Sequence, residues 1–477
     1  MSENANILPQ IKVQEPEPSD DTPWNGEILG RKACADKLTA VIQGQIAPMT
    51  ISVNGEWGSG KTFMLKRWQK QLKQDGFTAI YFNAWEDDFL ADPLVAIVGQ
   101  LYKELNQGTL KDVCETVKKA AIPFLKRVGL SMLNKGVERI TGVDVAGIIE
   151  EDIQTAKESV FDDYVSMTES RETLREALQN LANENFEEKK IPLVFIVDEL
   201  DRCRPTFAIE VLERIKHLFN INHMVFVLGI DRRSLGKSIQ SVYGDIDAEN
   251  YLHRFIDFDF LLPPADHKFF TGAMWDRYHI PDILTGLANT STTSGAIISQ
   301  SNEFKEVVVF LFTLHQFTLR EIEQSIKLFS LLLKTVPPNH NIFPLLIPIL
   351  MVLKLKNPAL YSQYVNSACS VSAVMEYLCP SRITSSEDFK TLIPAVVLST
   401  VSQHDPWRKI VQEIQARHNN EEVDIGELKS IEFFKAFSGS DIADFARRTK
   451  ALSTAYNSSA VRWVHELLNL FSFKPSL

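Results

Sequence analysis

The sequence predicts an α/β protein in which a parallel sheet is followed by a largely helical C-terminal region. Short, continuously apolar runs alternate with amphipathic helical patterns up to about residue 265, which is typical of a parallel sheet covered on both faces. Beyond that residue the patterns are helical, and no two-residue alternation stands out. We therefore expect an α/β core with a helical insertion, and a helical C-terminal region after it.

The first half of the expected core contains two helices and two strands. Apolar residues recur at helical spacing in residues 30–45 and 62–74, so each segment predicts an amphipathic helix. Residues 49–54 and 77–83 are short β-branched or aromatic runs and predict buried strands. A glycine-rich turn separates the first strand from the second helix.

The second half of the core begins after a long insertion. Residues 93–186 have a mainly helical and polar pattern. Residues 193–197 and 224–230 are continuously apolar and predict buried strands, with an amphipathic helix at 206–219 between them. Residues 256–262 are a further strand candidate that two prolines end.

These patterns suggest a domain organisation. Residues 1–21 are rich in Glu, Asp and Pro and are expected to be a flexible acidic tail. Residues 22–265 are expected to form the α/β core, with the helical insertion at about 93–186. We expect a helical lid subdomain at 266–340 and a helical C-terminal domain at 341–477.

The composition narrows the class of protein. The 477 residues include 50 basic and 61 acidic side chains, for a formal net charge of −11, so a whole-chain positive field for nucleic acid or anionic membrane is absent. The five cysteines are scattered without a C-x-x-C pair, which argues against a disulfide framework or a zinc ribbon and favours a reducing compartment. We expect a cytoplasmic enzyme or regulator.

No membrane span is expected. The N-terminal segment lacks the basic region followed by an apolar region that marks a secretory signal. The longest apolar run, residues 342–353, contains two prolines and is shorter than the roughly 20 residues that a span requires. It predicts a buried or proline-kinked helix.

The glycine-rich turn matches the phosphate-binding pattern GxxxxGK(S/T). Its glycines let backbone N–H groups point at phosphate oxygens, and the following helix adds its positive N-terminal end. Lys61 should reach the β- and γ-phosphates, and the Thr62 hydroxyl should take one Mg²⁺ position. The predicted nucleotide-binding residues in this loop are Gly55, Glu56, Trp57, Gly58, Ser59, Gly60, Lys61 and Thr62.

An acidic segment, LVFIVDELDRC, follows a later strand and is the expected partner of this loop. Asp198 would lie at the carboxyl edge of the sheet and hold Mg²⁺. Glu199 is the natural general base for the attacking water, and Asp201 is a third acid, so the sequence leaves the choice of base open. The alternative is a helix N-cap followed by a first-turn acid.

Further candidates for contact with the phosphates are an aspartate after another strand and several arginines. Asp231 could sense the γ-phosphate or orient water, or it could cap the helix that follows. A charge-neutralising arginine is expected in cis or in trans, and the sequence does not choose among Arg202, Arg232, Arg233, Arg254 and Arg320. ATP is favoured over GTP, because the nearest approach to an NKxD motif, at residues 134–137, lacks the acid.

Several segments together carry a family resemblance. The chain contains GEWGSGKT at 55–62, YFNAWEDD at 81–88, DELDRC at 198–203 and YLHRFIDFDFLLPP at 251–264, with ILGRK at 28–32 and FTLREIEQSIKLF at 317–329. Over about residues 22–335 it resembles the KAP family of P-loop NTPases.

The resemblance implies an AAA-related NTPase core with an additional strand, acting as an ATP-driven switch or assembly device. Arg320 resembles a sensor-2 residue, and Trp85 is expected to have a structural role in the core. Many members carry transmembrane helices between the P-loop and the acidic segment. Residues 111–170 are instead rich in charge, so the chain resembles soluble bacterial members, which are often associated with defence against phage beside an encoded effector.

The sequence leaves competing functions open. The first is an ATP hydrolase that switches a partner complex, with further copies of the chain or effectors encoded nearby as partners. The second is a non-hydrolysing scaffold that binds ATP as a structural ligand, and the third is a small-molecule kinase. Nucleic acid stays open as a ligand, because basic and apolar residues are interleaved in 118–135, although such runs are usually a solvated helix face.

Overall fold

The computed structural model of the chain describes residues 18–90, 92–105, 110–127, 160–290, 301–335, 344–369, 371–380, 387–400 and 458–470, together with single residues between 441 and 452. Most of the expected acidic tail, the middle of the expected insertion and residues 134–137 lie outside this part. The chain forms two compact units that divide between Ala265 and Asp266.

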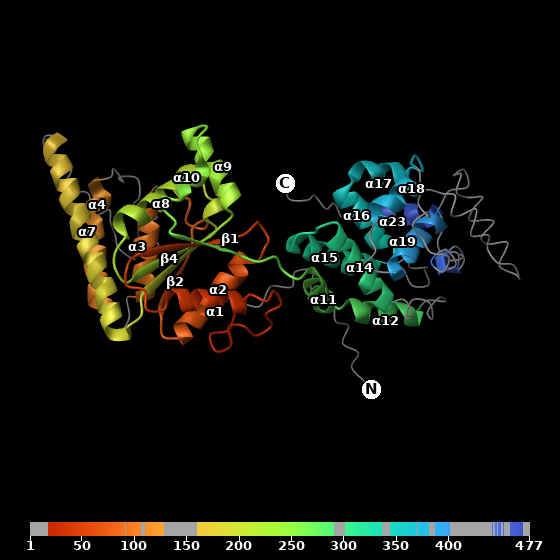
Figure 1. The fold of residues 1–477 in the computed structure, drawn as a ribbon, viewed down its shortest axis with the longest axis horizontal. Coiled ribbons are helices and arrows are strands. Elements are labelled where there is room, and N and C mark those ends of the chain that lie inside the picture. The colour runs from red at the N-terminus through yellow and green to blue at the C-terminus, as the bar shows by residue number, and fades with distance from the viewer. Residues whose placement is uncertain are drawn as a thin grey trace, which may run out of the picture. The chain divides into compact units, whose positions relative to one another are not determined.

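A five-stranded parallel sheet forms the centre of the first unit (Figure 1). Its strands lie in the order β2-β3-β4-β1-β5. They are β1 (Met49–Asn54), β2 (Thr78–Asn83), β3 (Leu193–Asp198), β4 (Met224–Ile230) and β5 (Phe258–Leu261). All five predicted strands are therefore confirmed. β4 lies between β1 and β3, so the strand before the glycine-rich turn and the strand before the acidic segment are not neighbours.

The register brings the carboxyl ends of the strands to one edge. Asn54 pairs with Ile230, and Asp198 lies between Asn83 on one side and Gly229 on the other. The polar residues that end β1, β2 and β3 (Asn54, Asn83 and Asp198) therefore lie along one edge of the sheet. The predicted site residues follow the strands at this edge.

Apolar side chains cover both faces of this sheet. Phe195 and Phe226 contribute to one buried cluster, whereas Ile196 and Val227, one position further along the same strands, contribute to the other. Every residue of β3 and β4 is buried, as expected for central parallel strands. β5 is the exception, because it forms an edge and is largely exposed.

Helices pack on the two faces of the sheet. α1 and α2 cover one face, and α3, α8 and α9 cover the other (Figure 1). The helices of this unit are α1 (Lys32–Ile42), α2 (Lys61–Gln74), α3 (Pro93–Leu105), α4 (Lys111–Arg127), α7 (Val160–Lys189), α8 (Pro205–Leu218), α9 (Arg232–Tyr243) and α10 (Ala248–Leu252). The long α7 packs along α4, so the insertion is helical wherever the structure describes it.

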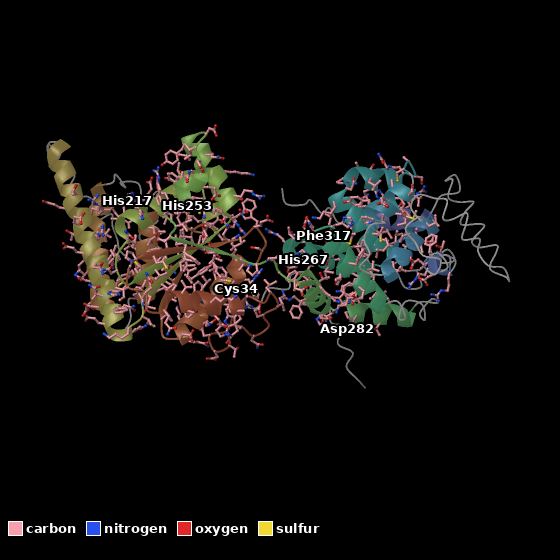
Figure 2. All side chains as sticks on the ribbon, viewed as in Figure 1. Cys34, His217, His253, His267, Asp282 and Phe317 are labelled. Atoms are coloured by element: carbon pink, nitrogen blue, oxygen red, sulfur yellow. The ribbon has the colours of Figure 1, made fainter. Side chains whose placement is uncertain are left out.

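In the described part of the second unit the regular secondary structure is helical. Its helices are α11 (His267–Arg277), α12 (Ile280–Thr290), α14 (Ser301–Leu314), α15 (Leu319–Thr335), α16 (Leu346–Lys356), α17 (Pro358–Val365), α18 (Val371–Leu378), α19 (Glu387–Ser399) and α23 (Ser458–Leu470). Cys34 in α1 and Phe317 between α14 and α15 mark the buried interior of the two units (Figure 2).

The apolar run predicted at 342–353 contributes most of α16, whose residues Leu346 to Leu353 are all buried. Residues 342 and 343, the first two of this apolar run, lie outside the described part of the chain. Among the helices that the structure describes, none combines the length and apolar character needed to cross a membrane.

Candidate nucleotide-binding site

The glycine-rich turn connects β1 to α2 at the carboxyl edge of the sheet. Gly58 and Gly60 have φ angles of 81° and 88°, in the left-handed region that glycine adopts without strain. Gly60 is the N-cap of α2, and a Cβ atom there would lie 2.6 Å from Leu29 Cδ1. The glycines therefore allow the tight turn that directs the first N–H groups of α2 outward, the arrangement that binds phosphate at a helix N-terminus.

Lys61 is the first residue of α2 and is largely buried. Its Nζ donates hydrogen bonds to the carbonyl oxygens of Gly55 at 2.6 Å and Glu56 at 3.2 Å. Burial lowers the pKa of this ammonium, and the charges of Asp201, Asp231 and Asp198 oppose that shift. Three of the predicted acidic residues therefore lie close enough to Lys61 to favour its charged form.

Asp198 ends β3 and is completely buried. Tyr81 Oη donates to Asp198 Oδ2 at 2.8 Å, and the backbone N–H of Glu199 donates to Oδ1 at 2.8 Å. Burial raises the pKa of the Asp198 carboxyl, whereas the nearby Thr62 hydroxyl and the hydrogen bonds from Tyr81 and the Glu199 N–H lower it. The Thr62 hydroxyl therefore lies close to Asp198, which brings the glycine-rich turn to the acidic segment.

The donor set at this junction fits Mg²⁺. A threonine hydroxyl and a carboxylate supply the hard oxygen ligands that this ion prefers, and Mg²⁺ usually takes only one or two carboxylates beside water and substrate phosphates. Among the described residues, no group of three His, Cys, Asp or Glu side chains forms a metal site of its own. Thr62 and Asp198 would hold the ion, which when bound with nucleotide would neutralise charge on the β- and γ-phosphates.

A glycine in β4 makes room for the Asp198 carboxylate. Gly229 is the register partner of Asp198, and a Cβ atom at this position would lie 2.6 Å from Asp198 Oδ1 and 2.4 Å from Leu65 Cδ1. Neither Gly229 nor Tyr81 was predicted as a site residue. A glycine inside a buried strand indicates that a neighbouring group approaches the strand closely, so Gly229 could have been found from the sequence. In the sequence alone, Tyr81 cannot be distinguished from an aromatic residue of the core.

Replacing Gly229 by alanine is expected to destabilise the protein by about 1–3 kcal/mol, because the added methyl group overpacks the contact with Leu65 and Asp198. Displacement of the carboxylate should also weaken magnesium-dependent binding of an ATP analogue, measured by calorimetry. The control is Gly236→Ala in α9, where the new Cβ would lie 3.4 Å from Ala248 Cβ. Equal magnesium dependence in Gly229→Ala and wild type would contradict the assigned role of Gly229.

Glu199 adopts an unusual backbone conformation directly after Asp198. Its φ of 60° and ψ of 26° place a non-glycine residue in the left-handed region, which costs about 1–3 kcal/mol and is common at functional sites. Its Oε1 pairs with Arg202 Nη1 at 2.6 Å, and the Arg202 guanidinium lies 5.7 Å from the centre of the Trp85 ring. The interpretation of Trp85 as a core residue was wrong, because its side chain is 53% exposed.

Asp201 contacts the glycine-rich turn directly. Trp57 Nε1 donates a hydrogen bond to Asp201 Oδ2, although half of the Trp57 residue surface is exposed. The other oxygen, Oδ1, is buried without a hydrogen-bond partner. Asp201 is thus fixed against the loop that carries Lys61, whereas Glu199 is paired with an arginine.

Asp231 ends the β4 segment and acts as a helix cap. Its side chain accepts hydrogen bonds from the N–H groups of Arg233 at 3.1 Å and Ser234 at 3.2 Å, at the start of α9. Its charge also acts on Lys61. The capping interpretation therefore describes the observed contacts, and a role toward phosphate stays a prediction.

The candidate arginines occupy different environments. Arg232 is buried and pairs with Asp259 and with Glu249, the latter at 2.7 Å, so it holds α9 to α10 and β5. Arg254 is exposed between α10 and β5. Arg320 lies in the first turn of α15 in the second compact unit, and its assignment as a sensor residue stays a prediction.

These features define the class of protein. A glycine-rich turn between a buried strand and a helix, a lysine at the helix start and a buried aspartate close to Thr62 are the parts of a P-loop nucleotide-binding domain. The model of the KAP family P-loop domain matches residues 31–336, and the chain belongs to this family.

The other comparisons add distant similarities. The chain is similar to the solved structure of the Aeropyrum pernix ORC2 protein in ADPNP–ADP complexes, at 13% identity and a TM-score of 0.33, covering 98% of this chain and 97% of that chain. It is also similar to the structure of Drosophila ORC bound to GC-rich DNA and Cdc6, at 11% identity and a TM-score of 0.33, covering 92% and 64%. No curated protein matches the chain.

Proposed function

We propose that the chain binds ATP with Mg²⁺, hydrolyses it, and uses the cycle to switch the conformation or assembly of a partner complex. The proximity of the Thr62 hydroxyl to the buried Asp198 carboxylate supports this proposal most directly, because it brings the glycine-rich turn (residues 55–62, the proposed phosphate loop) to the acidic segment. Glu199 and Asp201 follow within three positions and supply the acids that hydrolysis needs.

In the proposed reaction a water oxygen attacks the γ-phosphorus of ATP, and the bond from that phosphorus to the β–γ bridging oxygen breaks. The proton lost by the water passes to a carboxylate, for which Glu199 is our choice, and ADP and phosphate leave. Lys61 and the N-terminal N–H groups of α2 hold the β- and γ-phosphates. Asp201 provides negative charge beside Lys61 and fixes Trp57.

The pair between Glu199 and Arg202 supports partner-dependent turnover. Arg202 engages Oε1 of Glu199, and we expect hydrolysis by the isolated chain to be slow until a partner frees this oxygen. Arg202 lies over the exposed ring of Trp85, which a partner could contact directly. Proposed partners are further copies of the chain or effector proteins encoded nearby, in cytoplasmic defence against phage, as the family resemblance suggests.

Phosphate release and nucleotide binding by the purified chain test this proposal. We expect magnesium-dependent release of phosphate from ATP, and tighter binding of ATP than of GTP in a competition assay. Binding of ATP without phosphate release, even with the neighbouring gene products present, would favour the non-hydrolysing scaffold. Failure to bind either nucleotide would contradict the proposal altogether.

A further inference from the structure

A buried arginine joins the phosphate loop to the segment where the first compact unit ends. Arg31 precedes α1 and is 1% exposed. Its Nη2 donates to the carbonyl oxygen of Ser59 at 2.8 Å, and its Nη1 donates to the carbonyl oxygen of Pro263 at 2.7 Å. Ser59 belongs to the phosphate loop, and Pro263 lies two residues before the boundary at Ala265.

Arg31 is held in place from its own segment. The Glu27 carboxylate accepts the backbone N–H groups of Leu29 at 2.5 Å and Arg31 at 3.0 Å, which folds this segment into a compact turn. Leu29 Cδ1 in turn occupies the space beside Gly60, where a Cβ atom would lie 2.6 Å from it. The segment therefore contacts two successive residues of the phosphate loop, Ser59 through Arg31 and Gly60 through Leu29.

The charge of Arg31 is incompletely compensated. Both of the hydrogen-bond acceptors at its terminal nitrogens are neutral carbonyl groups, and its Nε is buried without a hydrogen-bond partner. Burial lowers the pKa of the guanidinium, although the Cys34 side chain and the charge of Glu27 oppose that shift. A buried cation of this kind is stabilised by any anion that binds nearby, because the low-dielectric interior screens the attraction weakly.

The peptide unit between Ser59 and Gly60 connects this cation to the proposed phosphate position. The Ser59 carbonyl and the Gly60 N–H are the two ends of one planar unit. A phosphate oxygen that accepts the Gly60 N–H polarises that unit and makes the Ser59 oxygen a stronger acceptor for Arg31. Since Arg31 also holds Pro263, phosphate binding at one end of the bridge stabilises the chain segment at the other end.

We propose that Arg31 is a positioning residue that couples nucleotide occupancy of the phosphate loop to residues 262–266, where the chain passes from the first unit into the second. This inference rests on the proposed nucleotide binding. By reciprocity, ordering of residues 262–266 strengthens nucleotide binding by the same factor. Leu262 is already tied to this edge, because its N–H donates to the carbonyl oxygen of Asn54 at 2.8 Å.

Hydrogen exchange of the full chain, with and without a non-hydrolysable ATP analogue and Mg²⁺, tests the coupling. In the wild type we expect the analogue to slow exchange of the amides of Leu262, Ala265 and Asp266 by roughly 5-fold or more. In Arg31→Lys this protection should fall below about 2-fold while the analogue still binds, because one ammonium lacks the planar fork that spans two carbonyls. Arg31→Met should lose the protection and also bind the analogue more weakly.

The matched control is Arg67→Lys, a change at a second buried arginine of this unit that lies over the Phe63 ring at 3.6 Å. It should leave the protection of residues 262–266 unchanged. Wild-type protein that binds the analogue without slowed exchange there would overturn the coupling and leave the proposed function standing. Full protection in Arg31→Lys would overturn the role of Arg31, whereas wild type that binds no nucleotide would overturn the proposed function first. Arg31→Lys keeps the test decisive if Arg31→Met fails to fold.

Discussion

Replacing Lys61 by alanine is expected to weaken ATP binding roughly 10- to 150-fold, because one charge-assisted contact to phosphate is worth about 1.5–3 kcal/mol. The side chain is positioned for this contact. It begins α2, it is largely buried, and its Nζ already lies against the Gly55 and Glu56 carbonyl groups of the loop. Calorimetry with a non-hydrolysable ATP analogue measures the loss, and phosphate release should fall with it.

A suitable control for this variant is Lys70→Ala on the same helix. Lys70 pairs with Asp20 at 2.6 Å, and Asp20 is mostly exposed, so its loss should change stability by less than about 1 kcal/mol and leave binding intact. Removal of Lys61 should not unfold the domain either, since the groups that it leaves behind are two backbone carbonyls at the edge of the loop. Undiminished affinity in Lys61→Ala would show that the nucleotide binds elsewhere.

The strands of the sheet were predictable because of their burial. β1 to β4 lie between two helical layers, so each appears in the sequence as a short run of apolar residues, and a run of that length between helical patterns is typical of a buried parallel strand. β5 gave a weaker signal, since it is an edge strand of four residues with Phe258 and Leu261 exposed. Patterns based on burial identify a solvent-exposed edge strand less clearly than a buried one.

The candidate site was predictable only where one segment contains the whole signal. The glycine-rich turn and the acids after β3 are local patterns, and the parallel sheet brings Thr62 and Asp198 together. Contacts that depend on register across strands were not predictable: Gly229 faces Asp198 because β3 and β4 pair as they do, and Tyr81 reaches Asp198 from β2. Trp85 shows the same limit, since an aromatic residue after a strand gives no indication of whether it turns inward or outward.

The choice between Glu199 and Asp201 as general base leads to the second large effect. Glu199→Gln is expected to lower phosphate release by roughly 10²–10⁴-fold while ATP still binds, because an amide cannot accept the proton of the attacking water. Asp201→Asn should lower it by less than about 10-fold, since the amide oxygen can still accept the Trp57 N–H and only the charge beside Lys61 is lost. Single-turnover hydrolysis together with calorimetry separates binding from chemistry.

The surroundings of the two acids favour this assignment. Asp201 already has one oxygen engaged by Trp57 of the phosphate loop. Its charge opposes the effect of burial on the pKa of Lys61. We therefore assign Asp201 to holding the loop and Lys61 in place before hydrolysis, and not to accepting the proton of water. Glu199 has a strained backbone and a single salt-bridge partner, Arg202, that could release it. Glu172→Gln, on an exposed pair with Arg171 in α7, is the neutral control. A larger loss of turnover in Asp201→Asn than in Glu199→Gln would reverse the assignment and make Asp201 the base.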